Sequence, residues 1–312
     1  GGNDRRIANA SSMDTELFFT RVMNYLAATI AGKFKPVKIV SNGSEANLFA
    51  IFTLTENSSA CLLACGSYVG GDLGLVHGYS TSDFANDGPA WIMEPCNVVN
   101  VTARKQTIPV PYHIPGVMDE QLLQEYEDQC LLHLHNRCLL QRTQGNPVKG
   151  VFLELVLASN GSTLSDHYLK KLGVLAKHHS FKIIVDEIMT SARYGVMLLT
   201  GTKPIEFVQE VAFITIGKWI KTGMVLASET QRMIMNNNVQ GMICRGTSHS
   251  IVINEASVYW DVVTQCLSGA EQRRCKVLKK LGIKKEDAWG GGIHIFAPLR
   301  YKGITRSTQN RF

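Results

Sequence analysis

The stretches FKIIVDE at residues 181–187 and VAFITIGK at residues 211–218 decide the fold of this 312-residue chain. Each is a short, nearly continuous apolar run, which is the pattern of a strand buried on both faces of a parallel sheet. Asp186 follows the first run and Lys218 follows the second. Because sites in such sheets lie beyond the carboxyl ends of the strands, we expect this carboxylate and this amine to face one site.

An amine and a carboxylate placed in this way can hold opposite ends of one planar ring. Lys218 can form an imine, and Asp186 can pair with a protonated pyridine nitrogen. Pyridoxal 5'-phosphate (PLP) is held in this way. The two residues therefore predict a PLP site.

A third stretch, SNGSEANLFAIFTL at residues 41–54, offers a place for a phosphate group. Its small residues run directly into an apolar periodic segment, so free backbone N–H groups and the positive end of a helix dipole would face the anion. Gly43 allows close approach of the backbone, and the Ser44 hydroxyl can add a bond. Judged alone, Ser44 fits equally well as a simple helix cap.

These segments resemble the class III aminotransferases. SNGSEAN is similar to their phosphate loop, VDEIMTSARYG to their Asp-Glu segment, and ITIGKWIKTGMVLASE to the segment around their Schiff-base lysine. CGSYVGG and VFLELV extend the resemblance, which covers roughly residues 37 to 260. It implies an α/β fold of the PLP-dependent transferase fold type I, with a mostly parallel sheet covered by helices and a shortened small C-terminal domain.

The resemblance implies roles for five residues. Gly43 and Ser44 would hold the phosphate, and Tyr68 would stack on the ring face. Asp186 would keep the ring nitrogen protonated. Lys218 would carry the internal aldimine and then act as the base that moves the substrate's α-proton, for which burial beside a cationic ring would lower its pKa.

The family also places polar groups around the cofactor at the positions of Glu154 and Glu187. The segment CRGTSHS is similar to a family stretch that reaches the phosphate from the partner subunit, which implies a homodimer with shared active sites. Two registers fit, with Thr247 or Ser248 at the contact, and Thr247 is favoured because Gly246 precedes it.

The chain departs from the family pattern near the lysine. Trp219 to Thr222 replace a stretch that is usually glycine-rich, and Met189 stands where glutamine is common. Lys221 is a rival for the imine, but it has no strand immediately before it, so Lys218 is preferred. Arg300 and Arg306 are candidates for the substrate carboxylate by position alone, and surface solvation is the favoured interpretation of each.

We expect three parts in the chain. They are an abbreviated N-terminal helical segment at residues 1–36, a large PLP-binding α/β domain at 37–268 and a partial C-terminal small domain at 269–312. Helices are expected at about 14–31, 119–141 and 165–178, and strands at about 60–64, 91–93, 150–155, 181–185 and 212–216.

The sequence predicts a PLP-dependent aminotransferase that moves an amino group between an amino compound and a keto acid or aldehyde. Another PLP reaction on the same fold, such as that of an aminomutase, a racemase or a decarboxylase, is the alternative. A non-catalytic scaffold is a third hypothesis, against which the retention of Asp186 and Lys218 argues, because a buried amine and carboxylate without partners cost stability.

Composition sets the remaining expectations. The formal charge of +6 comes from scattered Lys and Arg, so a solvated basic face or attraction for an anionic substrate is favoured over nucleic-acid binding. No apolar run approaches the roughly 18 to 20 residues that span a bilayer. Eight cysteines without a CxxC pair favour a cytoplasmic protein, and an organellar compartment stays open because the beginning can be trimmed. No metal site is expected, since His133 and His135 would point to different faces of one helix.

Overall fold

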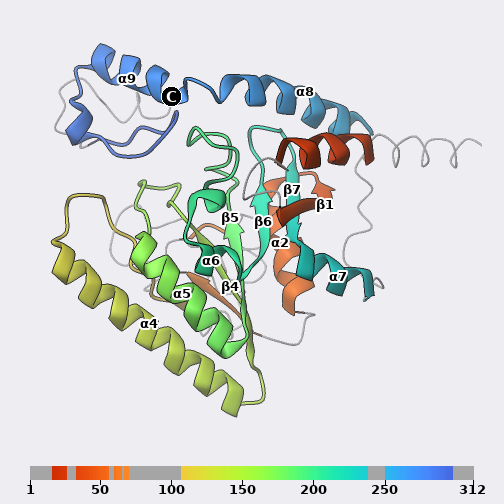
Figure 1. Ribbon diagram of the computed structural model, residues 1–312, viewed down its shortest axis with the longest axis vertical. Coiled ribbons are helices and arrows are strands. Elements are labelled where there is room, and N and C mark those ends of the chain that lie inside the picture. The colour runs from red at the N-terminus through yellow and green to blue at the C-terminus, as the bar shows by residue number, and fades with distance from the viewer. Residues whose placement is uncertain are drawn as a thin grey trace, which may run out of the picture.

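The computed structural model of the chain describes residues 16–26, 33–55, 60–64, 67–69, 107–237 and 250–297. Within them a seven-stranded sheet has the order β1-β7-β6-β5-β4-β2-β3 (Figure 1). The strands are β1 (Phe34–Val40), β2 (Ala60–Ala64), β3 (Thr107–Ile108), β4 (Val148–Glu154), β5 (Lys182–Asp186), β6 (Val211–Ile216) and β7 (Gly223–Ser228).

The sheet is mostly parallel, as the sequence predicted. β3, β2, β4, β5 and β6 pair in parallel, while β7 is antiparallel to both β6 and β1. The strands expected near 60–64, 150–155, 181–185 and 212–216 are present, and the one expected at 91–93 lies outside the described residues. β1 and β7 were not expected.

Helices cover both faces of the sheet. Alternate residues of the central strands belong to two separate hydrophobic clusters, with Ile184 on the face of α2 (Gly43–Thr55) and Val185 on the face of α5 (Asp166–His179). α4 (Glu120–Thr143) packs outside α5, as Figure 1 shows. The remaining labelled α-helices are α6 (Ile205–Val208), α7 (Glu229–Asn237), α8 (Ser250–Cys266) and α9 (Ala270–Leu281).

The two outer helices begin at side-chain caps that the sequence supplies. Asp119 accepts hydrogen bonds from the Gln121 and Leu122 N–H groups at the start of α4, and Ser165 Oγ accepts one from Tyr168 N at the start of α5. α5 ends at Ser180, whose left-handed backbone (φ 62°) turns the chain into β5. Ser165 and Ser180 therefore fix the two ends of α5, including the position of its last turn.

The C-terminal helix α8 contacts the N-terminal helix. The helix over residues 16–26 packs against α8, with the Phe18 and Trp260 rings edge to face at 6.1 Å. α8 and α9 are separated at residues 267–269, where the sequence placed a boundary. The division into three domains stays a prediction. None of the helices in the described ranges has both the length and the apolar character needed to cross a bilayer.

Candidate active site

Three polar residues lie side by side where β4, β5 and β6 end. Glu154 is in register with Asp186, and Asp186 is in register with Thr215. All three are buried. The parallel pairing therefore brings two carboxylates and a hydroxyl to one edge of the sheet, where the sequence predicted a site.

Asn47, on the buried face of α2, connects this edge to the helix. Its Nδ2 donates to Asp186 Oδ2 at 2.8 Å and to the Val69 carbonyl at 3.0 Å, while Thr215 Oγ1 donates to Asn47 Oδ1 at 2.7 Å. Asp186 Oδ1 accepts a further bond from Ile188 N at 2.8 Å. The carboxylate is thus fixed in orientation by N–H donors. Asn47 was not singled out from the sequence, although an amide inside an apolar helical face is a usable signal.

Burial raises the pKa of Asp186 to about 7, an effect that the N–H bonds from Ile188 and Asn47 reduce. Burial and the neighbouring Asp186 raise the pKa of Glu154 to about 8. No ion pair within 4.0 Å joins either carboxylate to a cation in the part of the chain that the structure describes. Two neighbouring acids without a close cation form a site that favours a positively charged ligand group.

Backbone groups hold the Glu154 carboxylate. Its oxygens accept bonds from Tyr68 N at 2.7 Å and Ala158 N at 3.2 Å. The Tyr112 hydroxyl donates to the Glu154 carbonyl at 2.6 Å. Glu154 therefore positions the backbone of Tyr68, whose side chain is exposed next to the site.

Lys218 follows β6 in a left-handed backbone conformation (φ 55°). Its Nζ contacts Met189 Sδ at 2.7 Å, three residues beyond Asp186. The Lys218 side chain is exposed, so the burial expected for it from the sequence is not found. Partial desolvation of its amine and the nearby Arg193 still lower the pKa of Lys218, against the opposing effect of Asp186 and Glu154. The amine thus shares the electrostatic environment of both acids.

The rival amine points elsewhere. Lys221 Nζ lies over the ring of Tyr259 on α8, 5.8 Å from the ring centroid. Trp219 is buried in the same direction, with its Nε1 donating to Ser191 Oγ at 2.8 Å and its ring 5.5 Å from that of Trp260. The bulky residues after Lys218 therefore pack toward α8.

The N-terminus of α2 is capped by a residue other than Ser44. Asn42 Oδ1 accepts from Glu45 N at 2.9 Å, and the Glu45 carboxylate accepts from Ser41 N at 3.0 Å. Within the described residues the Ser44 hydroxyl has no hydrogen-bond partner and stays available to a ligand. The simple capping role weighed for Ser44 is taken by Asn42.

Two glycines let this helix end approach the strand ends. A Cβ on Gly43 would lie 2.5 Å from Ile188 Cδ1, and one on Gly223 would lie 2.1 Å from the Asn42 carbonyl oxygen. The lack of a side chain at Gly43 thus lets the turn after Asp186 approach the start of α2. Gly223 likewise lets the start of β7 approach the backbone of Asn42. The three sequence segments singled out for the site meet here.

Glu187 has a structural environment. It is buried, and its carboxylate accepts bonds from Leu199 N at 2.7 Å and from both the N–H and the hydroxyl of Thr200. Its side chain holds the segment before α6, while its backbone N–H donates to the Thr215 carbonyl at 2.8 Å. Thr247, its alternative Ser248, Arg300 and Arg306 lie outside the described residues.

Arg193 and His294 border the site and were not singled out as site residues from the sequence. Arg193 Nη1 lies 3.5 Å from Met189 Sδ, the atom that Lys218 Nζ also contacts. Ile293 N donates to the Arg193 carbonyl at 2.7 Å, which brings the C-terminal segment alongside. Burial, Arg193 and Lys218 lower the pKa of His294 to about 4, so this imidazole is neutral at physiological pH.

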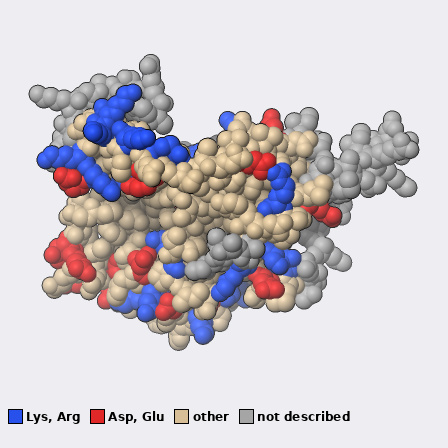
Figure 2. All heavy atoms as spheres, turned by 45° about the horizontal axis from the view of Figure 1, so that its top comes forward, with Lys and Arg blue, Asp and Glu red and all other residues tan. Residues whose placement is uncertain are grey.

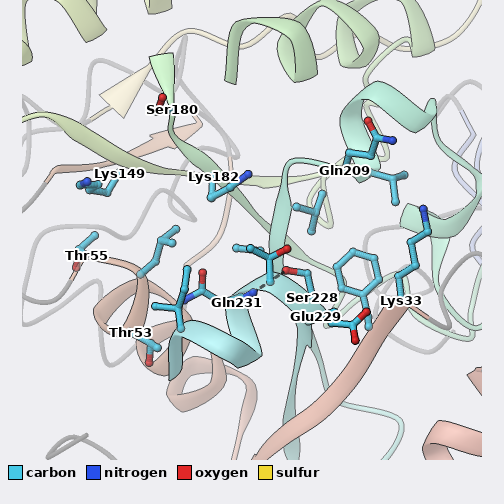
Figure 3. Close-up of a pocket in the computed structure, with 17 residues that line it drawn as sticks. Lys33, Thr53, Thr55, Lys149, Ser180, Lys182, Gln209, Ser228, Glu229 and Gln231 are labelled. Carbon is cyan, nitrogen blue, oxygen red and sulfur yellow. Dashed lines mark hydrogen bonds between the residues drawn. The ribbon is translucent and has the colours of Figure 1, made fainter. Parts of the chain in front are cut away.

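A cavity and a basic surface region lie away from the sheet edge that carries Asp186. A cavity of about 550 Å³ includes Lys149 and Lys182 in its lining, at the starts of β4 and β5 and thus at the opposite end of the sheet (Figure 3). Figure 2 shows Lys and Arg side chains gathered over α9. One of them, Arg274, is buried and pairs with Glu271 at 3.0 Å.

The raised acid pKa values predict a pH dependence of stability. Because the folded-state pKa values exceed the ordinary values of 3.8 and 4.5, the folded chain binds protons more tightly than the unfolded chain. Their contribution is complete below about pH 4 and is lost as the pH rises through 7 and 8. After removal of bound small molecules, urea titrations should show a lower unfolding free energy at pH 8.5 than at pH 5.

Glu154→Gln should flatten this dependence, by up to about 1.4 kcal/mol per pH unit. Glu45→Gln is the matched control because Glu45 is an exposed acid outside the sheet edge. Equal slopes for Glu154→Gln and the unmodified chain would show that the acid is not protonated in the folded state.

No family model and no curated protein matches the sequence. Solved structures do match the fold. Lysine aminotransferase from M. tuberculosis has a TM-score of 0.63 at 15% identity, over 94% of this chain and 72% of that chain. A taurine:2-oxoglutarate aminotransferase from Bifidobacterium kashiwanohense, in complex with PLP and glutamate, has 0.65 at 15%, over 94% and 69%.

An (S)-enantioselective omega-transaminase from Thermomicrobium roseum has a TM-score of 0.64 at 14% identity, over 98% of this chain and 71% of that chain. The chain spans 66% of the length of a mutant M. tuberculosis Rv3290c. These likenesses agree with the expected mostly parallel sheet covered by helices. The described chain has the fold of the PLP-dependent aminotransferases.

Proposed function

We propose that this chain is a PLP-dependent aminotransferase that transfers an amino group between an amino compound and a keto acid or aldehyde. The observation that carries the proposal is the buried Asp186 carboxylate, oriented by Asn47 and lacking a close cation, on the same sheet edge as the Lys218 amine. The aminotransferase fold of the neighbours supports the same conclusion.

The donors and acceptors of this edge fit PLP. A protonated ring nitrogen would give Asp186 the cationic partner that it lacks, and Lys218 would hold the aldehyde carbon. The Ser44 hydroxyl and the first turn of α2 would hold the phosphate, with Gly43 keeping that turn close to Ile188. Tyr68, whose backbone Glu154 fixes, is the candidate for the ring face.

PLP, when bound, supplies an electron-withdrawing ring that makes the substrate's α-hydrogen acidic. The chain's own residues would control the proton. The lowered pKa of Lys218 makes its ammonium easier to deprotonate, which suits a group that would take up a proton and return it. Asp186, held by its hydrogen bond from Asn47, would face the ring nitrogen and stabilise its positive charge.

Arg193 is the candidate cation for a substrate carboxylate in the described part of the chain. Its guanidinium reaches Met189 Sδ, a weak acceptor that lies beside the Lys218 amine. A carboxylate is a far stronger partner for a guanidinium than a thioether. We therefore infer that amino acids and keto acids, rather than simple amines alone, are the substrates.

The proposed assembly is a homodimer in the cytoplasm, with Thr247 or Ser248 reaching the partner's phosphate site. The sequence segment CRGTSHS supports the shared site. Within the described residues, no disulfide joins Cys61, Cys138, Cys266 or Cys275, as is usual for a reducing compartment.

Covalent labelling tests the cofactor assignment. Reduction of the PLP-treated chain with borohydride should fix the cofactor on Lys218, detected by peptide mass spectrometry. The Lys221→Arg variant should still be labelled on Lys218, because Lys221 points toward Tyr259. The Lys218→Arg variant should show no label above background on any lysine. A label on Lys221, or one spread over surface lysines, would refute the assignment.

Amino-group exchange tests the reaction itself. With an amino acid donor and a keto acid, the unmodified chain should form the exchanged pair, and Lys218→Arg should be slower by roughly 10²- to 10⁴-fold or more. Labelling at Lys218 without any exchange would favour an aminomutase, a racemase or a decarboxylase. Neither labelling nor spectral response to amines would favour a scaffold.

Arg193→Gln tests the carboxylate contact. Because a hydrogen bond to a charged group is worth about 1.5–3 kcal/mol, the KM for a keto acid should rise about 10- to 100-fold. An aldehyde acceptor without a carboxylate serves as the matched control, and its KM should change little. Equal effects on both acceptors, or no effect on either, would contradict the role of Arg193.

Light scattering of the purified chain tests the assembly. A mass twice that of the 34.5 kDa chain is expected. If Thr247 reaches across the interface, Thr247→Ala should weaken PLP binding and leave the dimer mass unchanged. A monomer that still binds PLP and exchanges amino groups would exclude the shared site.

A further inference from the structure

Three histidines meet where α4 packs against the end of α5. His135 lies on α4, and His178 and His179 are the last two residues of α5. One ring nitrogen from each lies within 4.8 Å of the other two. The His179 Nε2 and His135 Nδ1 atoms are 2.8 Å apart, and the ring of His178 is 4.8 Å from that of His179, centroid to centroid.

The rings are poorly satisfied by protein groups. Within the described residues they share one hydrogen bond, between His135 and His179, and His179 Nδ1 is buried without a partner. His179 is only 6% exposed. A buried polar atom without a partner costs free energy unless a ligand or water completes it.

The fold itself brings the three rings together, because they come from two helices that pack against each other. A neutral imidazole offers a lone pair to a metal ion. Arg142 borders the cluster, with its Nη2 3.5 Å from the His179 carbonyl.

We propose that His135, His178 and His179 bind one divalent transition-metal ion of the Zn²⁺ type, with water completing the coordination. Three imidazoles without a carboxylate suit Zn²⁺, Cu²⁺, Ni²⁺ or Co²⁺ and exclude the oxygen-loving Ca²⁺ and Mg²⁺. Tetrahedral Zn–N bonds require nitrogens about 3.3 Å apart, so separations of up to 4.8 Å would have to close by up to about 1.5 Å. His178 is exposed and gives an ion and water access.

The site is independent of the proposed PLP site. α5 ends just before β5 begins, whereas Asp186 closes the other end of that strand. An ion here would link α4 to α5 on the outer layer of the molecule and resist their separation. On α4 alone the sequence offers His133 and His135, which do not converge, and the other two ligands come from 43 and 44 residues further along the chain.

Titration of the full-length chain with Zn²⁺, followed by calorimetry, tests the site. One ion per chain should bind with a Kd at or below about 10 µM, and the Tm should rise with Zn²⁺. Substitution of a residue that only hydrogen-bonds to a metal ligand typically lowers metal affinity about 10- to 100-fold. His178→Gln and His135→Gln, which remove ligands directly, should therefore each weaken binding at least about tenfold and abolish the Tm shift. His178 is exposed, so its substitution should not unfold the chain.

His133→Gln is the matched control, because His133 is an exposed histidine two residues from His135 on the same helix. It should bind Zn²⁺ as the unmodified chain does. The exposed thiols of Cys266 and Cys275 are removed in a double serine variant, which should retain binding. No binding at 100 µM Zn²⁺, equal weakening by His133→Gln, or loss of binding in the serine variant would overturn the proposal.

Discussion

The arrangement at the sheet edge depends on a buried carboxylate held by an amide instead of a cation. Asn47 donates to Asp186 and accepts from Thr215, so one side chain of α2 fixes residues from two strands. Burying an acid in this way costs stability, as the raised pKa shows. The cost makes physical sense if the carboxylate is kept for a positively charged group that arrives from outside the chain.

The residues after β5 and β6 clarify the departures from the aminotransferase pattern. Trp219 packs against Trp260 in the core, so the missing glycines reflect a different attachment of this turn to α8 rather than a filled site. Met189 does lie at the site, against Lys218 and Arg193. The departure at Trp219 therefore gives no support to a non-catalytic scaffold. At Met189 the polar group that is common in the family is absent.

The sequence predicted the parts of the fold that are local. β4, β5 and β6 are continuous apolar runs, and α5 has both its periodicity and its Ser165 cap written in the chain. β1 was missed because Lys35, Pro36 and Lys38 break its apolar pattern, which an edge strand tolerates. Asn47 and the histidine cluster were missed because their roles depend on partners distant in sequence. Asp186 and Lys218 could be singled out because each lies at the carboxyl end of an apolar run, and their roles stay a prediction.

The pairing of β1 with β7 has a consequence for how the chain acquires its fold. Phe34 is opposite Ser228, so this edge cannot close until nearly two hundred further residues have been made. β4, β5 and β6 can pair earlier because they are closer in sequence. Because long-range pairings slow folding, β1 joins the sheet late, and the buried face of α2 stays uncovered until β6 and β7, against which it packs, have been made.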